Sequence, residues 1–125
     1  MQTLTSADFG QVVTQSGIVV VDCWAPWCGP CQMFGPVFEA TAEKYSQHVF
    51  AKLNTDEEQE IAQQLQIQSI PTLLIFRDGI LLFRQPGAMA GPGLEQLLEQ
   101  VEALDMDEVR QKLEEQRAGN AADSS

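Results

Sequence analysis

The sequence Trp24-Ala-Pro-Trp-Cys-Gly-Pro-Cys31 decides the fold, because it joins two contrasting patterns. Before it, residues 18–24 form a short run rich in β-branched side chains, which is typical of a strand covered on both faces. After it, apolar residues recur at three- and four-residue intervals as far as Ser46, which indicates a helix. Cys28 should therefore lie at or just before the N-terminus of that helix.

The spacing of the two cysteines points to thiol chemistry. Free backbone N–H groups and the helix dipole at a helix N-terminus favour a thiolate, so Cys28 is the candidate nucleophile. Cys31 follows one turn into the helix and should face the same side, which makes it the candidate resolving thiol. Gly29 adds no charge and Pro30 no N–H, so the thiolate is stabilised less than it would be beside a histidine. A less stabilised reduced form favours a stronger reductant.

The rest of the chain continues an alternation of strands and helices. Strand, helix and strand patterns follow one another over residues 49–53, 57–65 and 72–76. A hairpin turn signal at residues 77–79 then leads into residues 80–83 as an antiparallel partner. A last domain helix begins after the breaker at residues 91–93. We expect one α/β domain with a mixed central sheet of about five strands, flanked by helices.

The composition changes after the last domain helix. Asp105, with Glu108 three positions later, has the pattern of a capping box at the start of a further short helix. A narrow apolar stripe on that helix consists of Met106, Val109 and Leu113. The predicted boundaries are 1–103 for the domain, 104–117 for a C-terminal helical extension and 118–125 for a disordered tail. The extension could pack on the domain, self-associate through residues 105–117 or bind a dedicated partner.

Composition limits the partners and the location. The formal net charge is −11, from 18 acidic and 7 basic residues, so neither nucleic acid nor an anionic membrane surface is an expected partner. Residues 1–10 have no basic start and no apolar run, so we expect no targeting signal and a cytoplasmic location. Three cysteines do not make a dense disulfide framework, and in a reducing compartment a C-x-x-C pair suggests redox or metal chemistry.

Several motifs together closely resemble the thioredoxin family. The resemblance covers roughly residues 1–103 and is carried by residues 24–31, Asp22, 51–54, 69–73 and Gly87-Ala88. It implies a thioredoxin fold with a cis peptide bond before Pro71. It further implies a general protein disulfide reductase that cycles between a Cys28/Cys31 dithiol and a disulfide, with no cofactor beyond this redox-active pair and no metal. The implied partners are disulfide-containing proteins as substrates and a thioredoxin reductase as electron donor.

The resemblance also assigns roles to two charged residues. Asp22 interrupts an apolar strand and matches the buried acid that lies behind the cysteine pair in thioredoxins. Burial would raise its pKa toward a useful value, so Asp22 is the candidate acceptor of the Cys31 proton, directly or through water. Lys52 matches a family position whose ammonium lies near that acid, where its charge would oppose the effect of burial.

Substrate recognition is expected to depend on backbone and shape. In the family, the residue before the cis proline pairs with an extended polypeptide through its backbone, and here that residue is Ile70. The implied apolar rim around the cysteines consists of Trp27, Gly29, Pro30, Ile70, Pro71, Gly87 and Ala88. Gln85-Pro86 stands before Gly87 where the family usually has an apolar residue, so this part of the rim departs from the pattern.

Two alternatives belong to other classes of protein. A structural zinc site would need Cys23, Cys28, Cys31 and His48, although Cys23 should face away from the pair and nothing brings His48 close. Cys23 is more simply interpreted as a small buried hydrophobe. The second alternative is a binding or assembly module that acts through the C-terminal extension.

Overall fold

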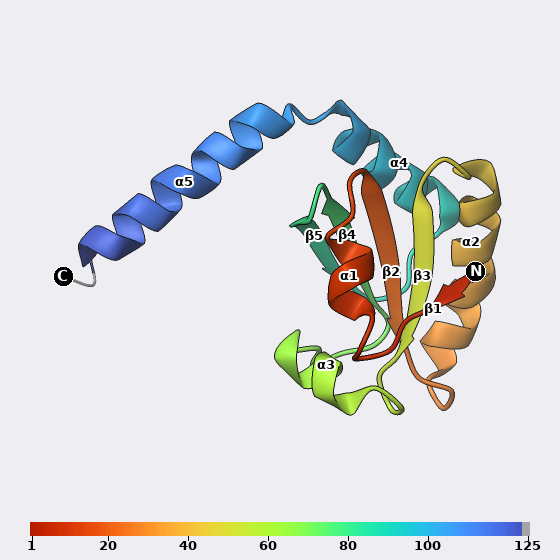
Figure 1. The fold of residues 1–125 in the computed structure, drawn as a ribbon. Coiled ribbons are helices and arrows are strands. Elements are labelled where there is room, and N and C mark those ends of the chain that lie inside the picture. The colour runs from red at the N-terminus through yellow and green to blue at the C-terminus, as the bar shows by residue number, and fades with distance from the viewer. Residues whose placement is uncertain (124–125) are drawn as a thin grey trace.

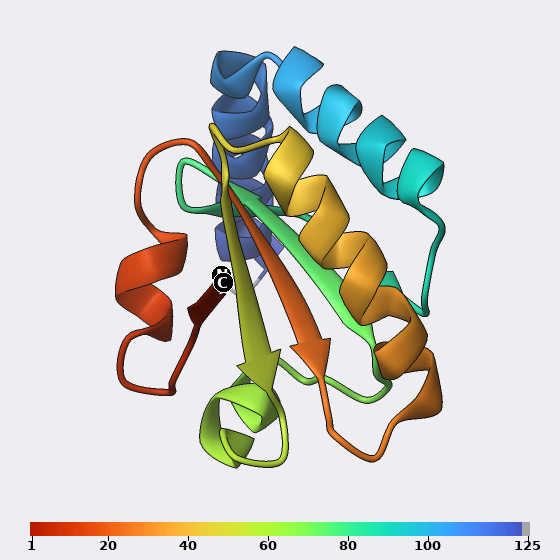
Figure 2. The same ribbon diagram turned by 90° about the vertical axis from the view of Figure 1, so that its right-hand side faces the viewer.

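The computed structural model describes residues 1–123, and the side chains of residues 1–119. One five-stranded sheet has the order β1-β3-β2-β4-β5. Its strands are β1 (Gln2–Thr3), β2 (Ile18–Trp24), β3 (Val49–Asn54), β4 (Thr72–Arg77) and β5 (Ile80–Pro86). The helices are α1 (Phe9–Val13), α2 (Gly29–Lys44), α3 (Gln59–Gln64), α4 (Gly91–Ala103) and α5 (Met106–Asp123). The predicted mixed sheet flanked by helices is confirmed, and Figure 2 shows α2 and α4 on one face and α1 on the other.

Strand β2 lies at the centre of the sheet and positions the site. It pairs in parallel with β3 and antiparallel with β4, and its first six residues are buried. Side chains alternate between the two faces, so Val19, Val21 and Cys23 join the core beside α1. Val20 packs with α2 and α4 on the other face. Asp22 is two residues further along β2, so its side chain lies on the same face as that of Val20, toward α2.

Helix α2 begins where the sequence predicted. Cys28 is its N-cap, and its sulfur accepts a hydrogen bond from the backbone N–H of Cys31 at 3.2 Å. Pro30 lies in the first turn, where a missing N–H costs no helical hydrogen bond. Pro36 lies inside the helix, which continues to Lys44. The first turn of α2 thus directly follows the loop that leaves β2.

The hairpin between β4 and β5 is confirmed at residues 77–79. Gly79 has a φ of +81°, a conformation that glycine adopts without steric cost. Asp78 also has a positive φ, and its Oδ1 accepts a hydrogen bond from the N–H of Gly17 at 2.8 Å. Asp and Asn tolerate this region better than most residues do, which fits Asp78 to the turn.

Two short elements near the N-terminus were not predicted. Strand β1 has two residues and pairs in parallel with β3. Helix α1 has five residues, of which Phe9, Val12 and Val13 are buried against the sheet. Both elements are too short for their periodicity to be recognised in a window of ordinary length.

The C-terminal extension differs from the prediction in its length. Helix α5 starts after Asp105, whose Oδ1 accepts from the N–H groups of Asp107 and Glu108 at 3.0 and 3.3 Å. It runs to Asp123, so residues 118–123 are helical where a tail was expected, and residues 124 and 125 lie outside the described part. Alanine is the best helix former, and three alanines occur between residues 118 and 122. Figure 1 shows α5 projecting away from the domain.

Candidate active site

The two cysteines form a disulfide at the N-terminus of α2. The Cα atoms of Cys28 and Cys31 are 5.2 Å apart, and each residue is only 4% exposed. The Cys28 sulfur also lies 3.6 Å from the carbonyl oxygen of Ile70. Gly29 and Pro30, between the cysteines, are exposed. The pair is therefore covered by its surroundings but reachable from the side of these two residues.

The loop before β4 lies beside the cysteine pair. The Ile70–Pro71 peptide bond is cis, as the family resemblance implied. The carbonyl of Pro71 accepts a hydrogen bond from the N–H of Gly87 at 2.8 Å, which ties the Gly87-Ala88 segment to this loop. Gly87 has a φ of +91°, which favours glycine, and both Gly87 and Ala88 are exposed. The structure thus places four of the predicted rim residues on two adjoining segments.

Trp27 is the most exposed aromatic residue of the rim. Its side chain is 70% exposed, and its Nε1 donates a hydrogen bond to Oδ2 of Asp56 at 2.7 Å. Asp56 follows β3, and its own N–H donates to the side chain of Asn54 at 2.9 Å. This contact could not be predicted from the sequence, because Trp27 and Asp56 are 29 positions apart.

Asp22 is a fully buried carboxyl group on the face of the sheet that α2 covers. It is 0% exposed, and neither of its oxygens has a hydrogen-bond partner among the described residues. Burial raises its pKa from 3.8 to about 6, against the opposing effect of the Lys52 ammonium; the Glu39 carboxylate raises it further. A carboxyl group with this pKa can gain or lose a proton near neutral pH.

Lys52 lies opposite Asp22 in the register of β2 and β3. Its Nζ is 5.0 Å from the centre of the Trp24 ring and 3.8 Å from Oε1 of Glu39. A Cβ added to Gly35 would lie 3.6 Å from the same Nζ, an ordinary contact distance, so this turn of α2 passes beside the ammonium. Lys52 is thus held among an aromatic face, a helix backbone and two carboxyl groups.

A cavity lies between this cluster and Cys31. It has a volume of about 260 Å³ and is lined by Trp24, Cys31, Gln32, Gly35, Pro36, Glu39 and Lys52. A water molecule occupies about 30 Å³ in the liquid, so the cavity has room and polar partners for several. It brings Cys31, Glu39 and Lys52 to the wall of one cavity, whereas the fully buried Asp22 is not among its lining residues.

The residues of the zinc alternative are not brought together. Cys23 is fully buried in the core beside α1, whereas Cys28 and Cys31 belong to a separate cluster with Ala25. Burial, with a further effect of Asp22, raises the pKa of Cys23 to about 12. His48 precedes β3, at the opposite end of that strand from the cysteine pair, and lies 3.6 Å from Glu102. The described residues contain no cluster of three or more metal-binding side chains.

A joined cysteine pair lies beside a cis proline, at the N-terminus of a helix that covers a buried acid. This arrangement defines a thiol-disulfide oxidoreductase. The comparisons name the family. The Thioredoxin family model matches residues 1–103. The "Putative thioredoxin 2" of Streptomyces coelicolor is 47% identical over 115 residues, which cover 92% of this chain and 86% of that protein. "Thioredoxin 1" of Synechococcus elongatus is 54% identical over 78 residues, which cover 61% of this chain and 73% of that protein.

Solved structures agree with this result. The thioredoxin of Plasmodium falciparum has a TM-score of 0.74 at 33% identity, covering 80% of this chain and 98% of that chain. Mitochondrial thioredoxin 3 of Saccharomyces cerevisiae, in its oxidized form, has a TM-score of 0.74 at 30% identity, covering 80% and 94%. The chain belongs to the thioredoxin family, and its activity is that of a protein-disulfide reductase. The alternative of a binding or assembly module gains no support from these comparisons.

No helix in the described part of the chain has the length and apolar character needed to cross a membrane.

Proposed function

We propose that the chain reduces disulfide bonds in a range of proteins, with Cys28 as the nucleophile and Cys31 as the resolving thiol. The observation that carries this proposal is the position of the Cys28 sulfur at the N-terminus of α2, where it accepts the N–H of Cys31. The same N–H and the helix dipole would stabilise a thiolate in the reduced protein. The redox group is the cysteine pair itself.

The reaction proceeds in two exchanges. The Cys28 thiolate attacks one sulfur of the target disulfide, a mixed disulfide forms, and the other target sulfur leaves as a thiolate. Cys31 then loses its proton, and its sulfur attacks the Cys28 sulfur. The Cys28–Cys31 disulfide forms while the remaining target sulfur leaves as a thiolate. The target gains two electrons, and the cysteine pair loses two.

Asp22 is the proposed acceptor of the Cys31 proton. A thiol with an ordinary pKa of about 8.5 is mostly protonated at neutral pH, so the second exchange needs a base. Asp22 lies buried on the sheet face that α2 covers, with its pKa raised to about 6, close to neutral pH. The cavity of about 260 Å³ lies between Cys31 and Lys52, the register partner of Asp22, and would supply water for the transfer. Lys52 tunes this base, since its ammonium favours the carboxylate form.

Target proteins would dock on the mostly apolar rim around the pair, in which Pro71 is buried and Ile70 half-buried while the other members are exposed. Trp27, Gly29, Pro30, Ile70, Pro71, Gly87 and Ala88 form this rim in the proposal. A low-relief apolar surface binds partners of varied sequence, and the backbone of Ile70 would add hydrogen bonds to an extended segment. We further propose re-reduction by a thioredoxin reductase and a cytoplasmic location, since a reducing compartment keeps the pair in its active dithiol form.

The test is reduction of insulin with dithiothreitol as electron source, which needs no reductase. We expect Cys28→Ser to abolish turnover and Cys31→Ser to accumulate a mixed disulfide that is visible by mass spectrometry. Cys23→Ala is the matched control, because this cysteine is buried on the other face and should leave turnover unchanged. Full activity of Cys28→Ser would contradict the assignment of the nucleophile. NADPH-linked and ferredoxin-linked reductases can then be compared as replacements for dithiothreitol.

A further inference from the structure

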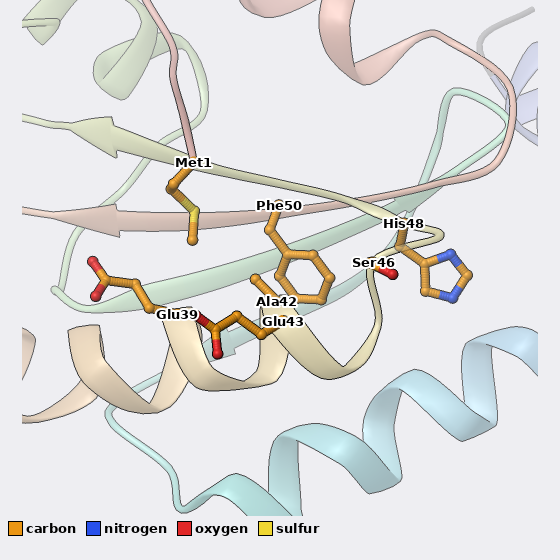
Figure 3. Close-up of a pocket in the computed structure, with 7 residues that line it drawn as sticks. All are labelled: Met1, Glu39, Ala42, Glu43, Ser46, His48 and Phe50. Carbon is orange, nitrogen blue, oxygen red and sulfur yellow. The ribbon is translucent and has the colours of Figure 1, made fainter.

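Glu39 lies on α2, where it lines two hollows. It lines the cavity of about 260 Å³ that reaches Cys31. It also lines a separate outer hollow of about 470 Å³, drawn in Figure 3, together with Met1, Ala42, Glu43, Ser46, His48 and Phe50. The Glu39 side chain is 59% exposed, whereas its partner Lys52 is 20% exposed. Glu39 therefore reaches from solvent toward the buried charges.

Few charged groups face Asp22 from the elements packed around it. Strand β3 contributes Lys52, its register partner, and strand β4 contributes the apolar Leu73. Helix α2 contributes Glu39 and Cys31, and Cys31 does not titrate while it is in the disulfide. Within the described residues, the charge balance at Asp22 thus depends on one cation and one anion.

The Lys52 ammonium has two carboxyl groups within reach, those of Glu39 and Asp22. The Lys52 ammonium can interact with the Glu39 carboxylate, 3.8 Å away, or turn toward the buried Asp22. Such a half-exposed pair contributes little to the free energy of unfolding. Its effect on a neighbouring buried acid is larger, because that acid has no water to screen it.

We propose that Glu39 is a positioning residue for proton transfer: it holds the Lys52 ammonium at the cavity wall, so that Asp22 remains basic enough to accept the Cys31 proton. The proposal rests on the proposed role of Asp22 as proton acceptor. Removing the Glu39 charge has two effects of the same sign. The direct repulsion between two carboxylates disappears, and Lys52 is free to move toward Asp22. Both effects stabilise the Asp22 carboxylate.

The first measurement is the pKa of Asp22 in the oxidised protein, where Cys28 and Cys31 do not titrate. The midpoint is followed through the Asp22 side-chain carboxyl ¹³C shift. We expect Glu39→Gln to lower it by about 0.5 pH unit, the size expected for one charge across a partly hydrated gap. Glu43→Gln is the matched control, because Glu43 lies one turn further along the same exposed face and does not line the cavity that reaches Cys31. It should move the midpoint by less than about 0.1 pH unit.

A double-mutant cycle with Lys52→Gln tests whether Glu39 acts through Lys52. In the Lys52→Gln background, the effect of Glu39→Gln should fall to half or less, because only the direct repulsion is left. An equal effect in both backgrounds would overturn the positioning role, and so would an unchanged or raised midpoint in Glu39→Gln. Glu39 is exposed, so its substitution should leave the far-ultraviolet circular dichroism unchanged.

The kinetic measurement separates this inference from the role of Asp22 itself. Mixed-disulfide resolution is followed by stopped flow between pH 5 and 9, after the first exchange with a model disulfide. A weaker base transfers the proton more slowly, so Glu39→Gln should slow resolution about twofold above pH 7 and move the inflection downward. If Asp22→Asn leaves the rate and its pH profile unchanged, the proposed role of Asp22 fails. If Asp22→Asn slows resolution but Glu39→Gln behaves like Glu43→Gln, only the inference about Glu39 fails.

Discussion

Asp22→Asn should stabilise the oxidised protein more as the pH rises. The native carboxyl group is fully buried without a hydrogen-bond partner among the described residues, and its pKa is raised from 3.8 to about 6. Between these two pH values the unfolded chain has lost the Asp22 proton while the native protein keeps it. The native protein therefore loses stability as the pH rises through this window. Asparagine cannot ionise, so the variant escapes this loss.

The size of the effect follows from the pKa. One pH unit corresponds to 1.36 kcal/mol, so a rise from 3.8 to about 6 costs the wild-type protein about 3 kcal/mol once Asp22 is ionised. The difference in unfolding free energy between Asp22→Asn and wild type should be constant below about pH 3.8. It should grow in favour of the variant up to about pH 6 and then level off. Packing of the new amide changes only the constant part.

Urea unfolding of both proteins at several pH values from 3.5 to 8 measures this difference directly. Asp107→Asn provides the matched control, because the Asp107 side chain is 96% exposed and its substitution should give a nearly flat difference. A difference that stays flat for Asp22→Asn, or that shrinks as the pH rises, would refute the reasoning. It would mean that the buried carboxyl group is stabilised by partners that the structure does not include.

Three further predictions use the same unfolding and activity assays. Gly79→Ala should lose about 1–2 kcal/mol, because φ is +81° at this position and a residue with a Cβ is strained there. Unchanged stability would contradict the conformation of the turn. Cys23 should resist iodoacetamide in the native reduced protein while Cys28 reacts, because it is 0% exposed with a pKa near 12; rapid labelling would contradict its burial. Removing residues 105–125 should lower the free energy of unfolding by about 1–3 kcal/mol, because the buried Met106 is lost, and should keep insulin turnover within twofold. Lost turnover would favour a role for α5 in the reaction.

The central elements could be predicted from the sequence because their patterns are long and buried. The run at residues 18–24 is strand β2 with the same bounds, since a strand covered on both faces shows as a continuous apolar stretch. Helix α2 and the hairpin at residues 77–79 carry their own N-terminal and turn signals. The short β1 and α1 lack such signals, because pairing with β3 and burial of three apolar side chains hold them in place.

The length of the C-terminal helix could not be predicted from the burial of apolar side chains. Residues 118–125 have almost nothing to bury, so the sequence predicted a tail, but helix α5 continues to Asp123. Backbone hydrogen bonds and alanine propensity extend a helix that has already begun, without a tertiary partner. Within the site, contacts between residues far apart in the sequence could not be predicted either. Asp56 and Glu39 reach Trp27 and Lys52 only because separate elements bring them together.

The register of the central strand separates the buried acid from the free thiol. Asp22 and Cys23 are neighbours in β2, so they point to opposite faces, one toward α2 and the cysteine pair, the other into the core beside α1. A slip of one residue would exchange them. It would place a third thiol behind the disulfide and an unpaired carboxylate in an apolar core, at a cost of several kcal/mol. The buried runs on both sides of β2 fix this register, so the packing of the core also determines which side chain occupies the position of the proposed proton acceptor.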